Sequence, residues 1–286
     1  MGLAKTVTPL DIEHARSVAV TAAEEAGVLL RGAVAGDLGT RVKDASGDVV
    51  TDLDLAAERL IVGHIRNSFP GHRIIGEEFG LLDTAESPWT WLVDALDGTN
   101  NVVIGLNTYV VGIALCENNV PVLGAVHDPV AQRTWSAVRG GGALGPGRPM
   151  TGPPHRPAAC GPILAWTQGY RVRRSDARAM ALRLVLESRA RRVLQLWTPL
   201  LSWVMLARGD IDGFVGYRPQ AVDLPAGRLI AQESGIMVLG LDGAPFDERV
   251  DVAEESRSFV AGRRELSSEL LDMVRAARGV TVDGIG

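Results

Sequence analysis

The chain has 286 residues, a formal net charge of -5 and a hydrophobic content of 46%. This composition is typical of a soluble globular protein and gives no overall electrostatic footprint for nucleic acid, so no nucleic-acid partner is expected. No apolar run is long enough to span a membrane, and residues 1–10 lack the zones of a secretory signal. We therefore expect a cytoplasmic protein with no membrane partner. Two cysteines are too few for a disulfide framework or a zinc site.

The domain organisation follows from the length and from the absence of a break in composition. No linker rich in Ser, Gly or Pro and no block of charge splits the chain. We expect a single unit over residues 1–286, with two lobes of about residues 1–150 and 151–286 and ample core.

Hydrophobic periodicity and turn signals predict the regular elements. Consecutive strands in the middle of the chain indicate an antiparallel meander rather than repeated strand-helix-strand units. The predicted helices cover residues 9–30, 52–67, 171–192, 199–208, 223–234 and 266–277. The predicted strands cover residues 74–75, 91–93, 109–115, 120–126, 133–138, 211–215, 237–240 and 258–261.

Two aspartates open the helix predicted at residues 52–67. Thr51 is a suitable N-cap, and Asp52 and Asp54 then lie in the first turn, where the helix dipole favours carboxylates. A capping role is the simplest interpretation of both. The same Asp-x-Asp pattern occurs in metal-dependent glycosyltransferases, although a three-residue pattern recurs by chance.

The stretch from Trp91 to Gly105 is the centre of the chemical hypothesis. An apolar run of strand length stops at Asp94, and Asp97 follows directly before the turn-forming Gly98. Two acids on one tight turn repel each other unless a cation lies between them, and oxygen ligands favour a hard ion such as Mg²⁺. The alternative is an ordinary Asp-Gly hairpin corner with solvated acids.

Two further acidic segments could join this site. Glu77 and Glu78 lie between glycines at the end of a short strand, only a short segment before the Asp94 strand. Asp223 is predicted at the N-terminal end of a helix, where the structural alternative is a capping aspartate. Together Glu77, Asp94, Asp97 and Asp223 are the carboxylates that a two-metal phosphoryl-transfer site needs.

A glycine-rich segment at residues 140–145 fits the pattern Gly-x-Gly-x-x-Gly and follows a strand. Pro146 and Pro149 occupy the positions where a phosphate-binding helix would begin, so we interpret the segment as a hairpin turn rather than a dinucleotide site. The eight arginines within residues 171–192 most simply form a solvated helix face. The alternative is that one or two of them contact an anionic substrate or a neighbouring subunit.

The order of the acidic motifs resembles the inositol monophosphatase family over nearly the whole chain. The resemblance implies an α+β fold, the layered α-β-α-β-α sandwich of the inositol monophosphatase and fructose-1,6-bisphosphatase superfamily. It also implies a homodimer and, often, sensitivity to lithium. The matching segments are Asp54 after Val49-Val50-Thr51, Gly76-Glu77-Glu78, Asp94-x-x-Asp97-Gly98-Thr99 with Asn101, and Val222-Asp223 before Ala226-Gly227.

The resemblance also implies a metal site with two or three Mg²⁺ ions. Glu77, Asp94 and the backbone carbonyl of Leu96 would hold one ion. Asp94, Asp97 and Asp223 would hold a second.

Catalytic roles follow from the same resemblance. Asp54 and Thr99 would together orient and deprotonate the attacking water, and Glu77 is counted with them as catalytic. The backbone amides of Gly98 and Thr99 would cradle the phosphate.

Departures from the family pattern fall at the substrate end of the site. Ala95 replaces a usual proline without loss of a ligand, but Trp197 stands where inositol-specific members have glycine, and Gly216 stands where they have a hydroxyl-binding glutamate. These changes predict a substrate other than myo-inositol 1-phosphate. The expected substrate-binding residues are Asp97, Gly98, Thr99, Trp197, Gly216 and Asp223.

The sequence therefore predicts a Mg²⁺-dependent phosphomonoesterase that hydrolyses a small phosphorylated metabolite, such as an inositol, sugar or aminocyclitol phosphate, by attack of a metal-activated water. One alternative is a haloacid-dehalogenase-like phosphatase, which also uses an Asp-rich turn but with one residue between its acids instead of two. Another is a binding or regulatory member of the family that has lost turnover.

Overall fold

A computed structural model describes residues 10–33, 38–43, 48–82, 86–150 and 161–281. The helices are α1 (Ile12–Ala33), α2 (Asp52–Ser68), α3 (Thr99–Val103), α4 (Ala177–Arg189), α5 (Pro199–Arg208), α6 (Pro225–Glu233) and α7 (Arg264–Ala277), with a 3₁₀ turn at Glu254–Arg257. The strands are β1 (Arg41–Val42), β2 (Val49–Val50), β3 (Arg73–Gly76), β4 (Gly80–Leu81), β5 (Trp89–Asp97), β6 (Val110–Glu117), β7 (Val120–Asp128), β8 (Arg133–Val138), β9 (Gly142–Gly145), β10 (Arg148–Met150), β11 (Ile163–Gln168), β12 (Arg192–Leu194), β13 (Gly213–Tyr217), β14 (Met237–Gly240) and β15 (Phe259–Gly262).

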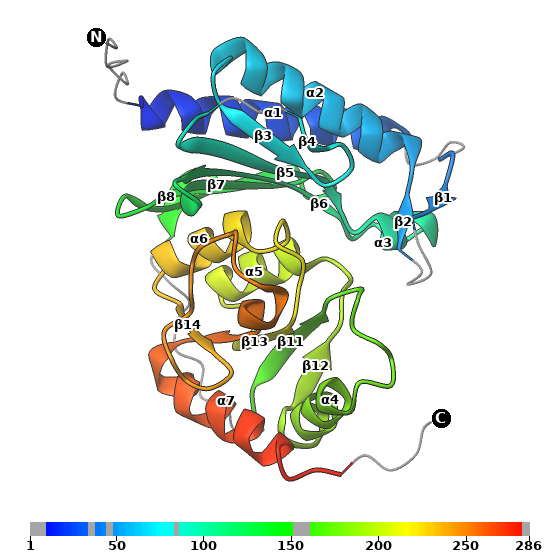
Figure 1. Cartoon of the computed structure of the whole chain (residues 1–286), viewed down its shortest axis with the longest axis vertical. Coiled ribbons are helices and arrows are strands. Elements are labelled where there is room, and N and C mark those ends of the chain that lie inside the picture. Colours follow the sequence, from blue (N-terminus) through cyan, green and yellow to red (C-terminus); the bar gives the residue numbers. More distant parts are fainter. Residues whose placement is uncertain (1–9, 34–37, 44–47, 83–85, 151–160, 282–286) are drawn as a thin grey trace.

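Helices and sheets alternate in five layers (Figure 1). Helices α1 and α2 cover the outer face of an eight-stranded sheet, and α5 and α6 lie between that sheet and a five-stranded one. Helices α4 and α7 cover the far face of the second sheet. This arrangement confirms the predicted layered α+β sandwich.

The outer helix α1 packs on the first sheet through small side chains. Because positions three and four apart lie on one face of a helix, its alanines form a continuous buried surface that contacts α2 and β7. The predicted start of this helix at Pro9 lies outside the described residues. The buried alanines are Ala15, Ala19, Ala22, Ala23 and Ala26.

The eight-stranded sheet has the strand order β10-β9-β8-β7-β6-β5-β3-β4. Strands β5 to β10 pair antiparallel in sequence, which confirms the predicted meander, and β3 joins β5 in parallel. The glycine-rich segment at residues 140–145 forms a turn and strand β9, and a second turn leads into β10. Residues 146–150, where the phosphate-binding helix would begin, form this turn and β10 instead of a helix, so the hairpin interpretation is confirmed.

The middle layer carries the largest buried aromatic groups. Trp203 of α5 stacks on Phe259 of β15 with ring centroids 4.7 Å apart, and Phe214 of β13 meets both rings edge-on at 5.0 Å. Such pairs each contribute about 0.5–1.5 kcal/mol beyond their burial. The cluster that contains them also includes side chains of the first sheet, so the two sheets share one core.

The five-stranded sheet has the order β12-β11-β13-β15-β14, with β11 parallel to both of its neighbours. The helix predicted at residues 171–192 is shorter in the structure. It begins at Ala177, after Asp176 accepts a 2.8 Å hydrogen bond from the Ala179 amide, and β12 follows at Arg192. The preceding residues 171–176 form a loop, because this aspartate caps the helix there.

The predicted lobe boundary near residue 150 falls between the two sheets, and the segment 151–160 lies outside the described residues. Across the described ranges, no helix combines the length and apolar character needed to cross a bilayer.

Candidate active site

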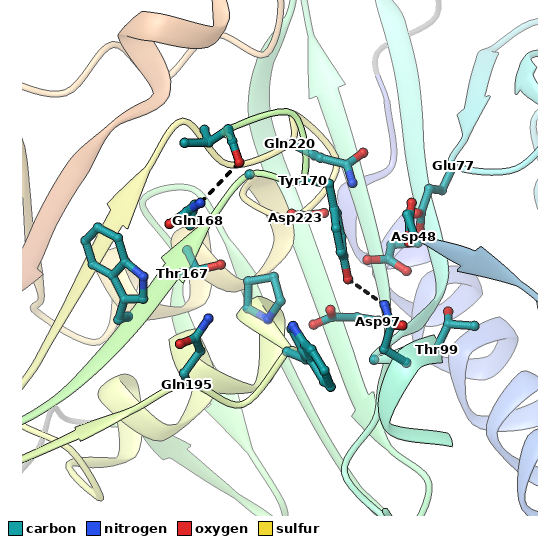
Figure 2. Close-up of a pocket in the computed structure, with 18 of the residues that line it drawn as sticks. Asp48, Glu77, Asp97, Thr99, Thr167, Gln168, Tyr170, Gln195, Gln220 and Asp223 are labelled. Carbon is teal, nitrogen blue, oxygen red and sulfur yellow. Dashed lines mark hydrogen bonds between the residues drawn. The ribbon is translucent and has the colours of Figure 1, made fainter. Parts of the chain in front are cut away.

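A cleft of about 570 Å³ is lined by residues from both halves of the chain. This volume is sufficient for a small metabolite, since ligand sites of roughly 300–1,000 Å³ are typical. Figure 2 shows the labelled Asp48, Glu77 and Asp97 on one side of it, and Thr167 and Gln168 of β11 on the other. The acidic residues that line the cleft are Asp48, Glu77, Asp94, Asp97 and Asp223.

Asp94 and Asp97 both reach the cleft because strand β5 is irregular between them. The predicted strand end at Asp94 is wrong, since β5 continues to Asp97. Its register against β6 shifts between the two aspartates. Residues three apart on a regular strand face opposite sides, and an irregularity of this kind restores a common face. The bulge therefore places both carboxylates at the cleft.

Gly98 makes the turn from β5 into α3 possible. Its φ of 108° lies in the left-handed region, and a Cβ there would stand 2.8 Å from both the Thr108 carbonyl oxygen and Thr198 Oγ1. Only glycine fits this conformation and this contact. Thr99 then begins α3 and lines the cleft.

Asp54 combines a structural role with a contact to Thr99, which lines the cleft, although Asp54 itself is not a lining residue. Its Oδ2 accepts hydrogen bonds from the Thr51 amide at 2.8 Å and the Thr51 hydroxyl at 2.5 Å, which confirms that Thr51 and Asp54 cap α2. Its Oδ1 accepts a 2.7 Å bond from the Thr99 hydroxyl. Burial raises the pKa of Asp54, and the bonds from Thr51 and Thr99 oppose that rise. Asp52, by contrast, is exposed and pairs with Arg41.

Asp223 is not the helix cap that its sequence position suggested. Helix α6 begins at Pro225 with Leu224 at the N-cap, so Asp223 lies one residue before the cap. Its carboxylate lines the cleft instead. Burial and the neighbouring Glu77 raise the pKa of Asp223 well above its usual value.

Lys43 is a site residue that the sequence analysis missed. Its ammonium group lies 2.8 Å from Glu77 Oε1, 2.5 Å from Glu78 Oε1 and 3.5 Å from Asp48 Oδ2. Burial, the largest single cause, would lower the pKa of Lys43, but Glu77, Glu78 and Asp48 together raise it above its usual value. The feature of the sequence that could have identified Lys43 is its position: it is the only basic residue between Val42 and Glu58, a segment that contains several acidic residues.

The remaining carboxylates repel one another. Burial, then Glu77 and Asp97, raise the pKa of Asp94 well above its usual value, and burial with Asp223 does the same for Asp97. Among the described residues, neither Asp94, Asp97 nor Asp223 forms an ion pair with a lysine, arginine or histidine. A further positive charge would therefore relieve this repulsion.

A hard cation fits the donors that are present. Asp94 Oδ1 is buried and has no hydrogen-bond partner among the described residues, which is costly for a carboxylate oxygen in the absence of a ligand. All the donors are oxygens, as Mg²⁺ prefers. No three acidic, histidine or cysteine side chains of the described ranges stand in a preformed coordination cage. An ion held by these carboxylates would compete with Lys43 for Glu77.

Of the two residues predicted to set substrate specificity, one lines the cleft and the other does not. Trp197 lines the cleft, is 49% exposed and has a φ of 55°, a strained conformation for a bulky residue that is often found at functional sites. Gly216 is buried in β13 and does not line the cleft; a Cβ there would stand 2.2 Å from Phe259 Cε1. The structure therefore contradicts the predicted substrate contact at Gly216, because its side-chain direction points into the aromatic core.

Asn101 holds the Trp197 loop against the metal-site turn. Its side-chain amide donates to the carbonyl oxygens of Thr108 at 2.7 Å and Leu196 at 2.6 Å, and to the Thr198 hydroxyl oxygen at 2.8 Å. Since these partners come from both halves of the chain, the bonds fix Trp197 relative to the carboxylates.

Several neutral and basic residues of the cleft were not predicted individually. The hydroxyl oxygen of Tyr170 accepts a 3.0 Å hydrogen bond from the side-chain amide of Asn100, which is one of the dashed lines in Figure 2. Arg174 and Arg183 come from the arginine-rich segment, for which a contact with an anionic substrate was the alternative interpretation. The remaining unpredicted lining residues include Trp166, Met180, Gln195 and Gln220.

Residues 11–277 match the family model described as the inositol monophosphatase family. The chain belongs to this family. The match covers both sheets and every acidic residue of the cleft. It confirms the resemblance inferred from the motifs and gives no support to a haloacid-dehalogenase-like protein.

The similar proteins are named either as inositol monophosphatases or as the Nus factor SuhB. The chain is 34% identical over 244 residues to the inositol-1-monophosphatase of Mycobacterium bovis, covering 78% of this chain and 83% of that protein. It is 30% identical to inositol monophosphatase 1 of Solanum lycopersicum, covering 82% and 88%. It is also 33% identical to the Nus factor SuhB of Pasteurella multocida, covering 79% and 85%.

Solved structures agree with the fold. The IMPase of Thermotoga maritima matches with a TM-score of 0.78 and 27% identity, covering 93% of this chain and 98% of that one. The suhB protein of Bartonella henselae matches with a TM-score of 0.82, covering 93% and 100%; at 24% identity it bears on the fold alone.

Proposed function

We propose that this protein is a Mg²⁺-dependent phosphomonoesterase acting on a small phosphorylated metabolite by direct attack of water. The observation that carries the proposal is the convergence of five carboxylates on one cleft, with the buried Asp94 Oδ1 lacking a partner. Relatives named as inositol monophosphatases support the same class of reaction.

Five groups would hold the metal ions. Glu77, Asp94 and the carbonyl of Leu96 would bind one, and Asp94, Asp97 and Asp223 a second; these carboxylates and Leu96 line the cleft. Magnesium bound there supplies charge neutralisation for the phosphate oxygens and lowers the pKa of a bound water.

Thr99 and Asp54 would position and deprotonate the attacking water. The Thr99 hydroxyl already donates to Asp54 Oδ1 at 2.7 Å, so its oxygen is left to accept a hydrogen bond from water in the cleft. A proton taken by Thr99 from the water can pass on to Asp54, whose other oxygen stays fixed by Thr51. The amides of Gly98 and Thr99 would bind the phosphate.

Phosphate release with and without Mg²⁺ tests the proposal. We expect the wild-type protein to hydrolyse at least one of a panel of inositol, sugar and aminocyclitol phosphates, and chelation to abolish release. Acid quenching during turnover should trap no aspartyl-phosphate, since water attacks directly; a trapped adduct would favour the haloacid-dehalogenase chemistry.

A protein without turnover is the competing proposal, because several relatives are named as a Nus factor and not as a phosphatase. It predicts no phosphate release from any compound of the panel at saturating Mg²⁺. Homodimer formation, inferred from the family, stays a prediction that light scattering can test.

A further inference from the structure

The cleft has two chemically different ends. Its carboxylates face a second group of lining residues that carry positive charge or N–H donors, contributed by β11, by the loop before α4 and by α4 itself. Figure 2 shows Thr167 and Gln168 of this group across the cleft from Glu77 and Asp97. If metal ions hold the reacting phosphate at the end with the carboxylates, which we call the carboxylate end, this second group has no role in the hydrolysis step itself. We call the other end the basic end.

Two arginines of the basic end are available to bind a ligand. Within the described ranges Arg174 has no hydrogen-bond or ion-pair partner. Arg183 has one ion pair, with Glu187 at 3.7 Å, between side chains that are about half exposed, and such pairs contribute little. The nearby Asp176 is committed to the α4 cap through the Ala179 amide. Among the described residues, Arg174 is therefore unpaired and Arg183 has only this one weak ion pair.

A buried donor points to the same conclusion. Trp166 lines the cleft and is 2% exposed, and its indole Nε1–H has no acceptor in the part of the chain that the structure describes. An indole nitrogen can only donate, and a buried donor without a partner is costly. An acceptor oxygen supplied by a ligand would remove that cost. Gln168 is already engaged, since its side-chain amide donates to the Val172 carbonyl at 3.2 Å.

We propose that Arg174, Arg183 and Trp166 form a second anion subsite, and that the natural substrate is a phosphomonoester with a second anionic group, a carboxylate or a phosphate. The inference rests on the proposed function, in which the first phosphate binds at the carboxylate end. Arginine suits either group, because its guanidinium presents paired donors to carboxylate and phosphate oxygens alike. The cleft volume of about 570 Å³ leaves room for a ligand that spans both ends.

Three compounds with the same reacting phosphate test the subsite. Glucose 1-phosphate has a neutral hydroxymethyl group at C6, glucuronic acid 1-phosphate has a carboxylate there, and glucose 1,6-bisphosphate has a phosphate. We expect kcat/KM to be about tenfold or more higher for at least one anionic compound than for glucose 1-phosphate, and this ratio to fall with added salt. The compound with the higher value identifies the second group.

Variants assign the preference to the proposed residues. The double variant Arg174→Gln, Arg183→Gln should bring the ratio of kcat/KM for the anionic compound to kcat/KM for glucose 1-phosphate toward one. The single variant Trp166→Phe should do the same. Arg173→Gln and Arg189→Gln are matched controls, because both arginines are exposed in the same segment and neither lines the cleft. They should keep the wild-type ratio. Equal kcat/KM values for the three compounds in the wild type, or an equal loss of preference in the controls, would overturn the subsite.

A binding measurement separates this inference from the proposed function. Calorimetry of the same three compounds on the Asp54→Asn protein with Mg²⁺ reports affinity without turnover. Hydrolysis of all three compounds with no difference in affinity refutes the subsite and leaves the phosphatase intact. Tighter binding of the anionic compounds that is lost in the Arg174→Gln and Arg183→Gln background supports the subsite. If the wild type at the same time releases phosphate neither from these three compounds nor from any compound of the wider panel, the phosphatase is refuted while the subsite stands.

Discussion

The two ends of the cleft differ in how their residues are brought together. At the carboxylate end, Asp94 and Asp97 come from one bulged strand, and Gly98 and Thr99 from the turn that follows it. At the basic end, Arg174 and Trp166 come from a loop and a strand of the other sheet. A short motif can thus encode the reacting centre, whereas the groups that contact the rest of the substrate depend on how the two sheets pack.

Removing a metal ligand should have the largest effect. Asp94→Asn should lower kcat/KM by at least about 1,000-fold, because an amide is a much weaker ligand for a hard cation. Asp223→Asn should also be severe. Phosphate release at saturating Mg²⁺ measures both, with Asp52→Asn as the matched control. Near-normal turnover of the Asp94 variant would mean that the carboxylate end does not bind the metal.

Gly216→Glu should unfold the protein or destabilise it strongly, by about 3 kcal/mol or more. The new side chain would overlap Phe259, whose Cε1 lies 2.2 Å from the position of its Cβ, and would bury a charge. Urea denaturation measures the loss, and Gly216→Ala should lose less. A stable Gly216→Glu protein with improved inositol phosphate hydrolysis would show that β13 does contribute to the substrate end.

The metal-free protein should lose stability as the pH rises. The pKa values of Asp94, Asp97 and Asp223 are raised by burial and then by neighbouring carboxylates, so the folded state binds protons more tightly than the unfolded chain. This contribution is complete below the ordinary value of 3.8 and is lost as the pH rises through the raised pKa values. Burial also raises the pKa of Glu78 to about 7, so the decline should extend to that pH.

Urea denaturation between pH 4 and pH 7.5 measures this decline. Saturating Mg²⁺ should flatten it, and Asp94→Asn should flatten it without metal, since one repelling charge is removed. An equal slope for the wild type and the Asp94 variant in EDTA would show that the carboxylate end does not set the pH dependence.

Asp52→Asn should have the smallest effect. Its carboxylate is 67% exposed and pairs with Arg41, which is also exposed, so the free energy of unfolding should fall by about 1 kcal/mol or less and turnover should stay near the wild-type value. Thermal denaturation and phosphate release measure these quantities. A loss of activity equal to that of Asp223→Asn would show that one of the two aspartates has been misassigned.

Local patterns in the sequence predicted part of the fold and most of the acidic residues that line the cleft. The meander, the capping of α2 by Thr51 and Asp54, and the hairpin at residues 140–145 each depend on neighbouring residues, so periodicity and turn chemistry predicted them. Glu77 and Asp97 were singled out for the same reason, because each lies at or directly after the end of a strand and before a turn.

Other features depended on contacts between distant segments, and only the tertiary structure decided them. Lys43 was missed because its partners Glu77 and Glu78 are more than thirty residues away. Gly216 was misplaced because the face of β13 that its side chain occupies is set by pairing with Phe259 of β15. The positions of Trp166 and Arg174 at the cleft likewise follow from packing between the sheets, which no local pattern encodes.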